Sequence, residues 1–217
     1  MNNPLHFITL SNALTAVEAL ATVAFALSGL VLAARKQLDA VGVCVVAGLA
    51  AFGGGTLRDI LLDRRPFFWV AHAGWLWALL VMCLGAMLFM RKHHVALTQR
   101  AMQWPDAIGL GLFTASGTQI ALEAGSPAFV AVLMGMMTAV FGGVLRDIVC
   151  NEIPSAFHDH QPYAVCAFVG GWVLVGSHLM GWPQWLSLLL GAGVATALRA
   201  LAMLLQLRLP SWQNSLH

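Results

Sequence analysis

Long apolar stretches alternate with short polar connections along almost the whole chain. The hydrocarbon core of a bilayer is about 30 Å thick and is crossed by roughly 20 residues of α-helix. Seven stretches have a suitable length: Ala13–Ala34, Asp39–Leu62, Phe67–Met90, Pro105–Ala124, Pro127–Cys150, Tyr163–Met180 and Pro183–Leu207. The eight prolines lie at the edges of these stretches or outside them, where a missing N–H does no harm. The pattern predicts an all-α integral membrane protein with seven transmembrane helices.

Composition supports this class and leaves no room for a separate soluble domain. Of the 217 residues, 59% are hydrophobic and only 9% are charged, whereas a soluble domain carries about 25% charged residues. We therefore expect a single membrane domain over residues 1–217, with the lipid bilayer as a partner. The formal net charge of +2 is too small to indicate nucleic-acid binding. No nucleophile–base set or metal-ligand spacing occurs, so we expect no enzyme activity, no cofactor and no structural metal.

A duplication at a fixed offset of 88 residues organises the chain. Phe52–Asp59 reads FGGGTLRD and Phe141–Asp147 reads FGGVLRD. The same offset relates Glu18 to Asp106, Ser28 to Ser116, Pro66 to Pro154 and His72 to His160. We place repeat one at about 13–90, repeat two at about 105–180, and a seventh helix outside the duplication at about 183–207. Each repeat holds an odd number of spans, so the second repeat is expected to be inverted in the membrane, as in many transporters.

The distribution of Lys and Arg predicts the orientation of the chain. With the N-terminus outside, the cytoplasmic side holds eight basic residues: Arg35, Lys36, Arg91, Lys92, Arg100, Arg146, Arg199 and Arg208. The other side holds only three, namely Arg58, Arg64 and Arg65. Because cytoplasmic connections carry the excess of positive charge, we expect the N-terminus outside and the C-terminus in the cytoplasm.

Glycines accumulate at the same place in both repeats. Gly53, Gly54 and Gly55 lie in the second stretch, and Gly142 and Gly143 lie in the fifth. Glycine costs about 1 kcal/mol relative to alanine inside a helix, which favours a break or kink beside a water-filled cavity. The alternative interpretation is that these glycines let two helices pack closely. The position of both groups just before an Arg-Asp pair favours the kink.

Each Arg-Asp pair is expected to belong to a charged cluster near one mouth of a passage. Adjacent helical residues project about 100° apart, so each charge is expected to find its partner on another helix. Depth in the membrane groups the outer set as Glu18, Arg58, Asp59 and His72, and the inner set as Asp106, Arg146, Asp147 and His160. With neutral histidine each set carries a formal charge of −1, which favours cations. The alternative is a pair of salt bridges that only lock the bundle.

Hydroxyl groups at repeat-related depths provide a further set of candidates. Ser28, Ser116 and Thr118 lie at depths at which they can replace part of the hydration shell of a cation. They can equally bond to a neighbouring helix, which contributes about 0.6 kcal/mol each. Arg199, in the seventh stretch, has no partner that the sequence suggests.

The paired motifs GGGTLRD and GGVLRD in duplicated three-span units, followed by a seventh span, resemble the trimeric intracellular cation channel (TRIC) family. The likeness is greatest to its prokaryotic members, which overlap a glycine-transporter domain family. The resemblance implies a homotrimer in a bacterial inner membrane, with one pore in each subunit. It implies that the second and fifth spans, kinked at their glycines, line this pore and pass monovalent cations, chiefly potassium. Val144 in place of Thr56, and Phe141 in place of Gly53, depart from strict repetition.

Two functions from different classes follow from this pattern. The first is a potassium-permeable channel, favoured by the resemblance and by the two negative mouths. The second is a secondary transporter of glycine or another small amino acid, whose broken helices would bind a zwitterion. A non-conducting membrane scaffold is a third and weaker interpretation.

Overall fold

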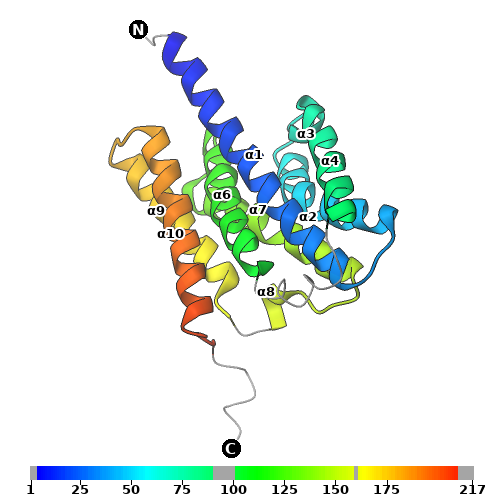
Figure 1. Ribbon diagram of the computed structural model, residues 1–217. Coiled ribbons are helices and arrows are strands. Elements are labelled where there is room, and N and C mark those ends of the chain that lie inside the picture. The colour runs from blue at the N-terminus through cyan, green and yellow to red at the C-terminus, as the bar shows by residue number, and fades with distance from the viewer. Residues whose placement is uncertain (1–3, 90–100, 159–160, 210–217) are drawn as a thin grey trace, which may run out of the picture.

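The chain folds as a bundle of helices, seen in a computed structural model that describes residues 4–89, 101–158 and 161–209. The helices within these ranges are α1 (Pro4–Arg35), α2 (Ala40–Leu61), α3 (Phe68–Ala71), α4 (Gly74–Phe89), α6 (Gln103–Glu123), α7 (Ala128–Val149), α8 (Ser155–His158), α9 (Tyr163–Leu179) and α10 (Gln184–Leu204). In Figure 1, α1, α2, α6 and α7 occupy the middle of the bundle, with α9 and α10 on one side and α3 and α4 on the other.

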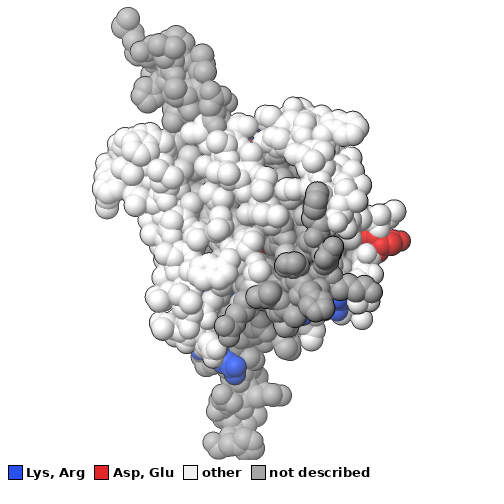
Figure 2. Space-filling model, in the orientation of Figure 1, with Lys and Arg blue, Asp and Glu red and all other residues white. Residues whose placement is uncertain are grey.

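Four of these helices are long and apolar enough to cross a membrane, over Ala13–Arg35, Ala40–Leu61, Ala128–Val149 and Gln184–Leu204. α4 and α9 are apolar but shorter, with 16 and 17 residues. α6 has 21 residues and carries several buried polar side chains. Figure 2 shows one face that is almost free of charge, with acidic and basic atoms visible mainly at its margins. The protein is therefore an all-helical membrane protein, while seven crossings remain a prediction.

The N-terminal end of α2 is fixed by a side-chain cap. Asp39 has an extended backbone, and its carboxylate accepts the N–H of Gly42 at 2.7 Å. This bond satisfies one of the N–H groups that the first turn of a helix leaves without a partner. The residue at which the chain leaves α2, Asp63, adopts a positive φ of 50°, and Asn151 after α7 does the same with 55°. Asp and Asn tolerate this conformation better than other non-glycine residues.

Asp39→Ala is expected to destabilise the protein by about 1 kcal/mol, because the cap of α2 is lost. Thermal unfolding in detergent measures the change. Asp39→Asn is the matched control, since its amide oxygen still accepts the N–H of Gly42. Equal midpoints for wild type and Asp39→Ala would show that the cap contributes nothing.

The third predicted stretch is not one helix. The structure divides it into α3 and α4, with a turn at His72 and Ala73. α3 is attached to α2 by two hydrogen bonds: the N–H of Phe68 donates to Asp59 Oδ2 at 2.8 Å, and Trp69 Nε1 donates to Thr56 Oγ1 at 3.0 Å. These bonds hold the first turn of the stretch against α2, and a separate helix begins at Gly74.

The structure shows no interruption of the helices at the glycines, and the predicted kink stays a prediction. α2 and α7 are each a single α-helix through the glycine motif, and they pack against each other. A Cβ added at Gly54 would lie far inside contact distance of the Thr138 carbonyl oxygen, and one at Gly142 would do the same at Ala50. The glycines therefore allow two backbones to touch, so the cost of glycine in a helix is offset by close packing.

This contact between α2 and α7 is reciprocal. Gly54 meets Thr138 and Gly142 meets Ala50, and both pairs repeat the offset of 88 residues. The two helices run antiparallel, because the position contacted on α7 moves toward its N-terminus as the position on α2 moves toward its C-terminus. Figure 1 accordingly places α3, which follows α2, and α8, which follows α7, at opposite ends of the bundle.

Candidate functional site

A buried ion cluster lies near the C-terminal end of α2, and we call it the Arg58 cluster (Glu18, Arg58 and Asp59). Arg58 Nη1 donates to Glu18 Oε1 on α1 at 2.6 Å, and Arg58 Nη2 donates to Asp59 Oδ1 at 2.7 Å. The guanidinium also lies 5.4 Å from the centre of the Phe68 ring. Arg58 and Asp59 are each 1% exposed and Glu18 is 6% exposed. The ions are thus held away from lipid by one another and by Phe68.

A second cluster lies near the C-terminal end of α7, and we call it the Arg146 cluster (Asp106, Arg146 and Asp147). Arg146 donates to Asp106 Oδ1 on α6 and to Asp147 Oδ1, both at 2.8 Å. Arg146 Nη1 also contacts the hydroxyl of Ser28 on α1. All four side chains are buried. The two clusters are therefore built alike, with a partner acid 40 residues before each arginine.

The expectation that neighbouring Arg and Asp do not pair is wrong. Arg58 donates from both Nε and Nη2 to Asp59 Oδ1, and Arg146 Nε donates to Asp147 Oδ1. The angle between adjacent Cβ directions limits short side chains, whereas the long stem of arginine can curl back to the next residue. Each arginine therefore has one carboxylate partner on its own helix and one on a neighbouring helix.

The second carboxylate oxygen of each motif aspartate holds the next segment of the chain. Asp59 Oδ2 accepts the N–H of Phe68 at the start of α3. Asp147 Oδ2 accepts the N–H of Ser155 at 2.9 Å and its hydroxyl at 3.1 Å, at the start of α8. A carboxylate near the N-terminus of a helix is also favoured by the helix dipole. The aspartates thus connect the arginines to the two short helices.

Of the two predicted histidines, the structure describes only His72, and it does not join the ion pairs of the Arg58 cluster. The His72 side chain hydrogen-bonds to the Phe68 carbonyl oxygen at 3.0 Å and stacks on Trp75 with 4.7 Å between ring centres. Its predicted depth in the membrane placed it in the Arg58 cluster, but the turn between α3 and α4 directs its side chain to Phe68 and Trp75 instead. His160 lies outside the described residues.

The predicted hydroxyl residues fall into two groups. Ser28 belongs to the Arg146 cluster, where it bonds to Arg146 and lies 3.4 Å from Asp106 Oδ1. Ser116 and Thr118 are fully buried on α6, and their hydroxyls have no hydrogen-bond partner among the described residues. Thr118 packs against α7 at Gly135 and against α9 at Gly171. The offset that relates Ser28 to Ser116 is therefore not repeated in their contacts.

The sequence analysis did not predict the residues of α9 and α10 that adjoin the Arg146 cluster. The hydroxyl of Tyr163 donates to Asp106 Oδ2 at 2.7 Å. Arg199 Cζ lies 4.8 Å from the centre of the Tyr163 ring, and Arg199 Nη1 donates to Gln161 Oε1 at 2.7 Å. The sequence did contain one indication of this contact: an arginine within an apolar helix, such as Arg199, is costly unless it has a partner. Its identity depends on how α9 and α10 pack, which the sequence does not specify.

Both clusters carry a net negative charge on side chains that are buried. Each contains two carboxylates and one guanidinium, a formal charge of −1. Buried charges are costly unless they are paired and hydrogen-bonded, and each arginine here meets both of its acids. A dehydrated cation approaching either cluster would encounter a net attraction.

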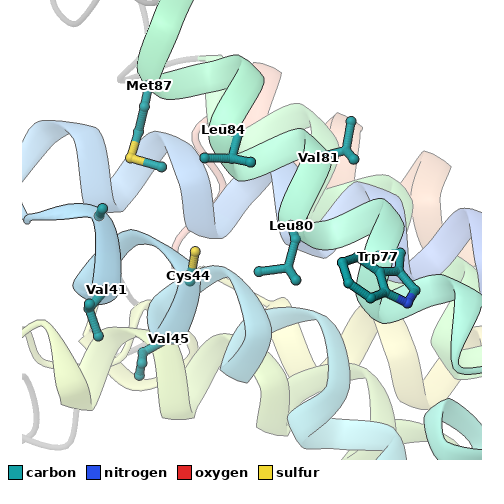
Figure 3. A pocket seen from close by; sticks show the side chains of 9 residues that line it. Val41, Cys44, Val45, Trp77, Leu80, Val81, Leu84 and Met87 are labelled. Carbon is teal, nitrogen blue, oxygen red and sulfur yellow. The ribbon is translucent and has the colours of Figure 1, made fainter.

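Apolar grooves on the surface do not contribute to these clusters. The groove in Figure 3, about 560 Å³ in volume, lies between α2 and α4. Leu80, Leu84 and Met87 of α4 face Val41 and Cys44 of α2 across it. No charged side chain among the described residues lines it, so it does not resemble a path for ions.

The fold and the clusters define a polytopic helical membrane protein with paired buried ion clusters. A family model described as "Glycine transporter" matches the chain twice, over residues 15–92 and 103–178. The chain therefore belongs to this family. It is 31% identical to the UPF0126 inner membrane protein YadS of Escherichia coli over 201 residues, which cover 90% of this chain and 94% of that protein.

Solved structures of TRIC channels share the fold. One, from work on conductance through TRIC cation channels, matches with a TM-score of 0.82 and 30% identity over 93% of this chain and 98% of that one. The TRIC orthologue of Rhodobacter sphaeroides matches with a TM-score of 0.81 and 30% identity, over 89% of this chain and 98% of its own. The chain is thus similar to TRIC channels in both sequence and fold.

Proposed function

We propose that the protein is a channel for monovalent cations, chiefly potassium, with one conduction path in each subunit. The observation that carries the proposal is the pair of buried clusters, each of formal charge −1, at opposite ends of the antiparallel α2–α7 pair. Negative rings at the entrances of a path favour cations over anions. The similarity to cation channels at 30% identity supports the same conclusion.

The conformation described here is, in this proposal, a closed one. Gly54 and Gly142 bring α2 and α7 into backbone contact between the two clusters. Conduction requires this contact to loosen, so that polar groups of α2, α6 and α7 face a hydrated path. Gly53 and Gly55 flank the contact and meet side chains, Leu145 and Phe68. Gly143, Ser116 and Thr118 are further residues that we assign to the path or its walls.

The proposed architecture is two inverted three-helix repeats and a seventh helix, all crossing the membrane. The reciprocal contacts of α2 with α7 and the matching ion pairs support it. We place the protein in a bacterial inner membrane with the N-terminus outside, since a relative carries that location in its name and the Lys and Arg distribution favours that orientation. A homotrimer is proposed from the similarity to trimeric channels.

A secondary transporter of glycine or another small amino acid is the second candidate. The description of the family model favours it. Such a transporter would need a site that binds a carboxylate and an ammonium together. The guanidiniums of Arg58 and Arg146 are already occupied by two acids each, which argues against them as the carboxylate-binding groups.

Flux measurements separate these functions. Purified protein in liposomes is expected to pass potassium down a gradient and to show unitary current steps in planar bilayers. Protein-free liposomes and a chloride gradient of equal size are the controls. Saturable uptake of labelled glycine without unitary potassium currents would establish the transporter instead. If the protein passes neither potassium nor glycine, a structural role is the remaining function.

A further inference from the structure

α10 buries a cation that the two repeats do not account for. Arg199 is 4% exposed, and within the described ranges it forms no ion pair with a carboxylate. Its Nη1 is bonded to the amide oxygen of Gln161, and its Nε is buried without a hydrogen-bond partner there. Intramembrane arginines are costly and usually serve function. Arg199 therefore needs an explanation beyond packing.

The environment of Arg199 links it to the Arg146 cluster through one aromatic ring. The guanidinium lies over the face of Tyr163, which attracts a cation through the ring quadrupole. The hydroxyl of the same ring donates to Asp106 Oδ2, and Asp106 Oδ1 accepts from Arg146. Arg199 is thus the outermost member of a connected series that ends in the cluster.

No matching series extends from the Arg58 cluster within residues 4–89, 101–158 and 161–209. The residue 88 positions before Tyr163 is Trp75, which stacks on His72 and lies edge-on to Phe68. α10 lies outside the duplicated segments. The additional cation near the Arg58 cluster is Arg64, which is 46% exposed and 3.8 Å from Asp59. Solvent and salt screen such an exposed charge, whereas Arg199 is shielded by its burial.

We infer that Arg199 is a built-in counter-charge that weakens cation attraction at the Arg146 end and so makes conduction directional. Counting only buried side chains of the described residues, Arg199 brings the formal charge at that end from −1 to zero, while the charge at the Arg58 end stays at −1. Cations entering from the Arg58 end meet the stronger attraction and carry the larger current. This inference rests on the proposed cation conduction.

Current asymmetry in planar bilayers tests the inference. With the protein inserted in one orientation and equal KCl on both sides, the wild type is expected to pass about two- to fivefold more current from the Arg58 end at 0.1 M salt. The ratio should fall only in part at 1 M, because salt screens a buried charge such as Arg199 less than an exposed one. Arg199→Gln should bring the low-salt ratio close to one, and Arg199→Lys should keep it. Arg208→Gln is the matched control, since Arg208 is exposed at the end of the same segment.

Symmetrical wild-type currents at low salt would overturn the inference without any variant. An Arg199→Gln ratio equal to that of the wild type, or an equal change in Arg208→Gln, would overturn it as well. The absence of any wild-type potassium current would instead refute the proposed function.

A spectroscopic measurement tests the Arg199–Tyr163 contact without conduction. Tyr163 is the only tyrosine in the chain, so the tyrosine doublet in the ultraviolet Raman spectrum reports its hydroxyl alone. Arg199→Gln should change the doublet and Arg208→Gln should not. An unchanged doublet in Arg199→Gln would show that Arg199 does not hold Tyr163, and would contradict the series on which the inference depends.

Discussion

Arg58→Met is expected to cost about 3–5 kcal/mol of folding free energy and to abolish potassium flux. The substitution leaves Glu18 and Asp59 buried and facing each other without their shared cation. Removing one partner of a buried ion pair is costly because the remaining charge has lost both solvent and counter-ion. Thermal unfolding in detergent and flux in liposomes measure the two effects.

Arg64→Met is the matched control for this substitution. Arg64 approaches the same Asp59 oxygen as Arg58, but at 3.8 Å and with 46% exposure. Exposed pairs of this kind contribute about 0–1 kcal/mol. If Arg58→Met and Arg64→Met unfold at the same temperature, burial of the Arg58 cluster does not stabilise the bundle.

Gly54→Ala is expected to destabilise the α2–α7 pair by about 1–3 kcal/mol, the usual cost of overpacking a core. The new methyl group would meet the carbonyl oxygen of Thr138, which belongs to the backbone and cannot move away by changing rotamer. Relief requires α2 and α7 to separate. If their contact closes the path, the variant should also leak more potassium than the wild type. Unfolding midpoints and liposome flux are the measurements.

Gly193→Ala provides the control, because beyond its own helix backbone and chain neighbours no described atom lies within 4 Å of the position that its Cβ would occupy. It should fold and conduct as the wild type does. If Gly54→Ala is less stable than the wild type and also passes less potassium, the conduction path lies somewhere other than between α2 and α7.

Helix location could be predicted from the sequence because it depends on length and hydrophobicity alone. Each predicted stretch contains a helix, and α2 differs from its prediction only in its terminal residues, Asp39 and Leu62, which cap it. The third stretch failed because the turn at His72 follows from hydrogen bonds of Phe68 and Trp69 to α2. Such bonds between segments leave no mark in a hydropathy pattern.

The sequence placed Glu18 with Arg58, and Asp106 with Arg146, by reasoning from depth in the membrane. The structure brings both pairs together, at 2.6 and 2.8 Å. The role of Gly54 could not be decided in the same way, because a glycine permits both a kink and a close contact. The position of Thr138 on the opposite helix shows that Gly54 serves a close contact.

The hydrogen bonds from Phe68 and Ser155 to the motif aspartates have a mechanical consequence. Each links a surface connection to a guanidinium inside the bundle through one carboxylate. A force that displaces α3 or α8 must therefore either strain that carboxylate or pull it from its arginine. The two connections are therefore mechanically coupled to the buried ions.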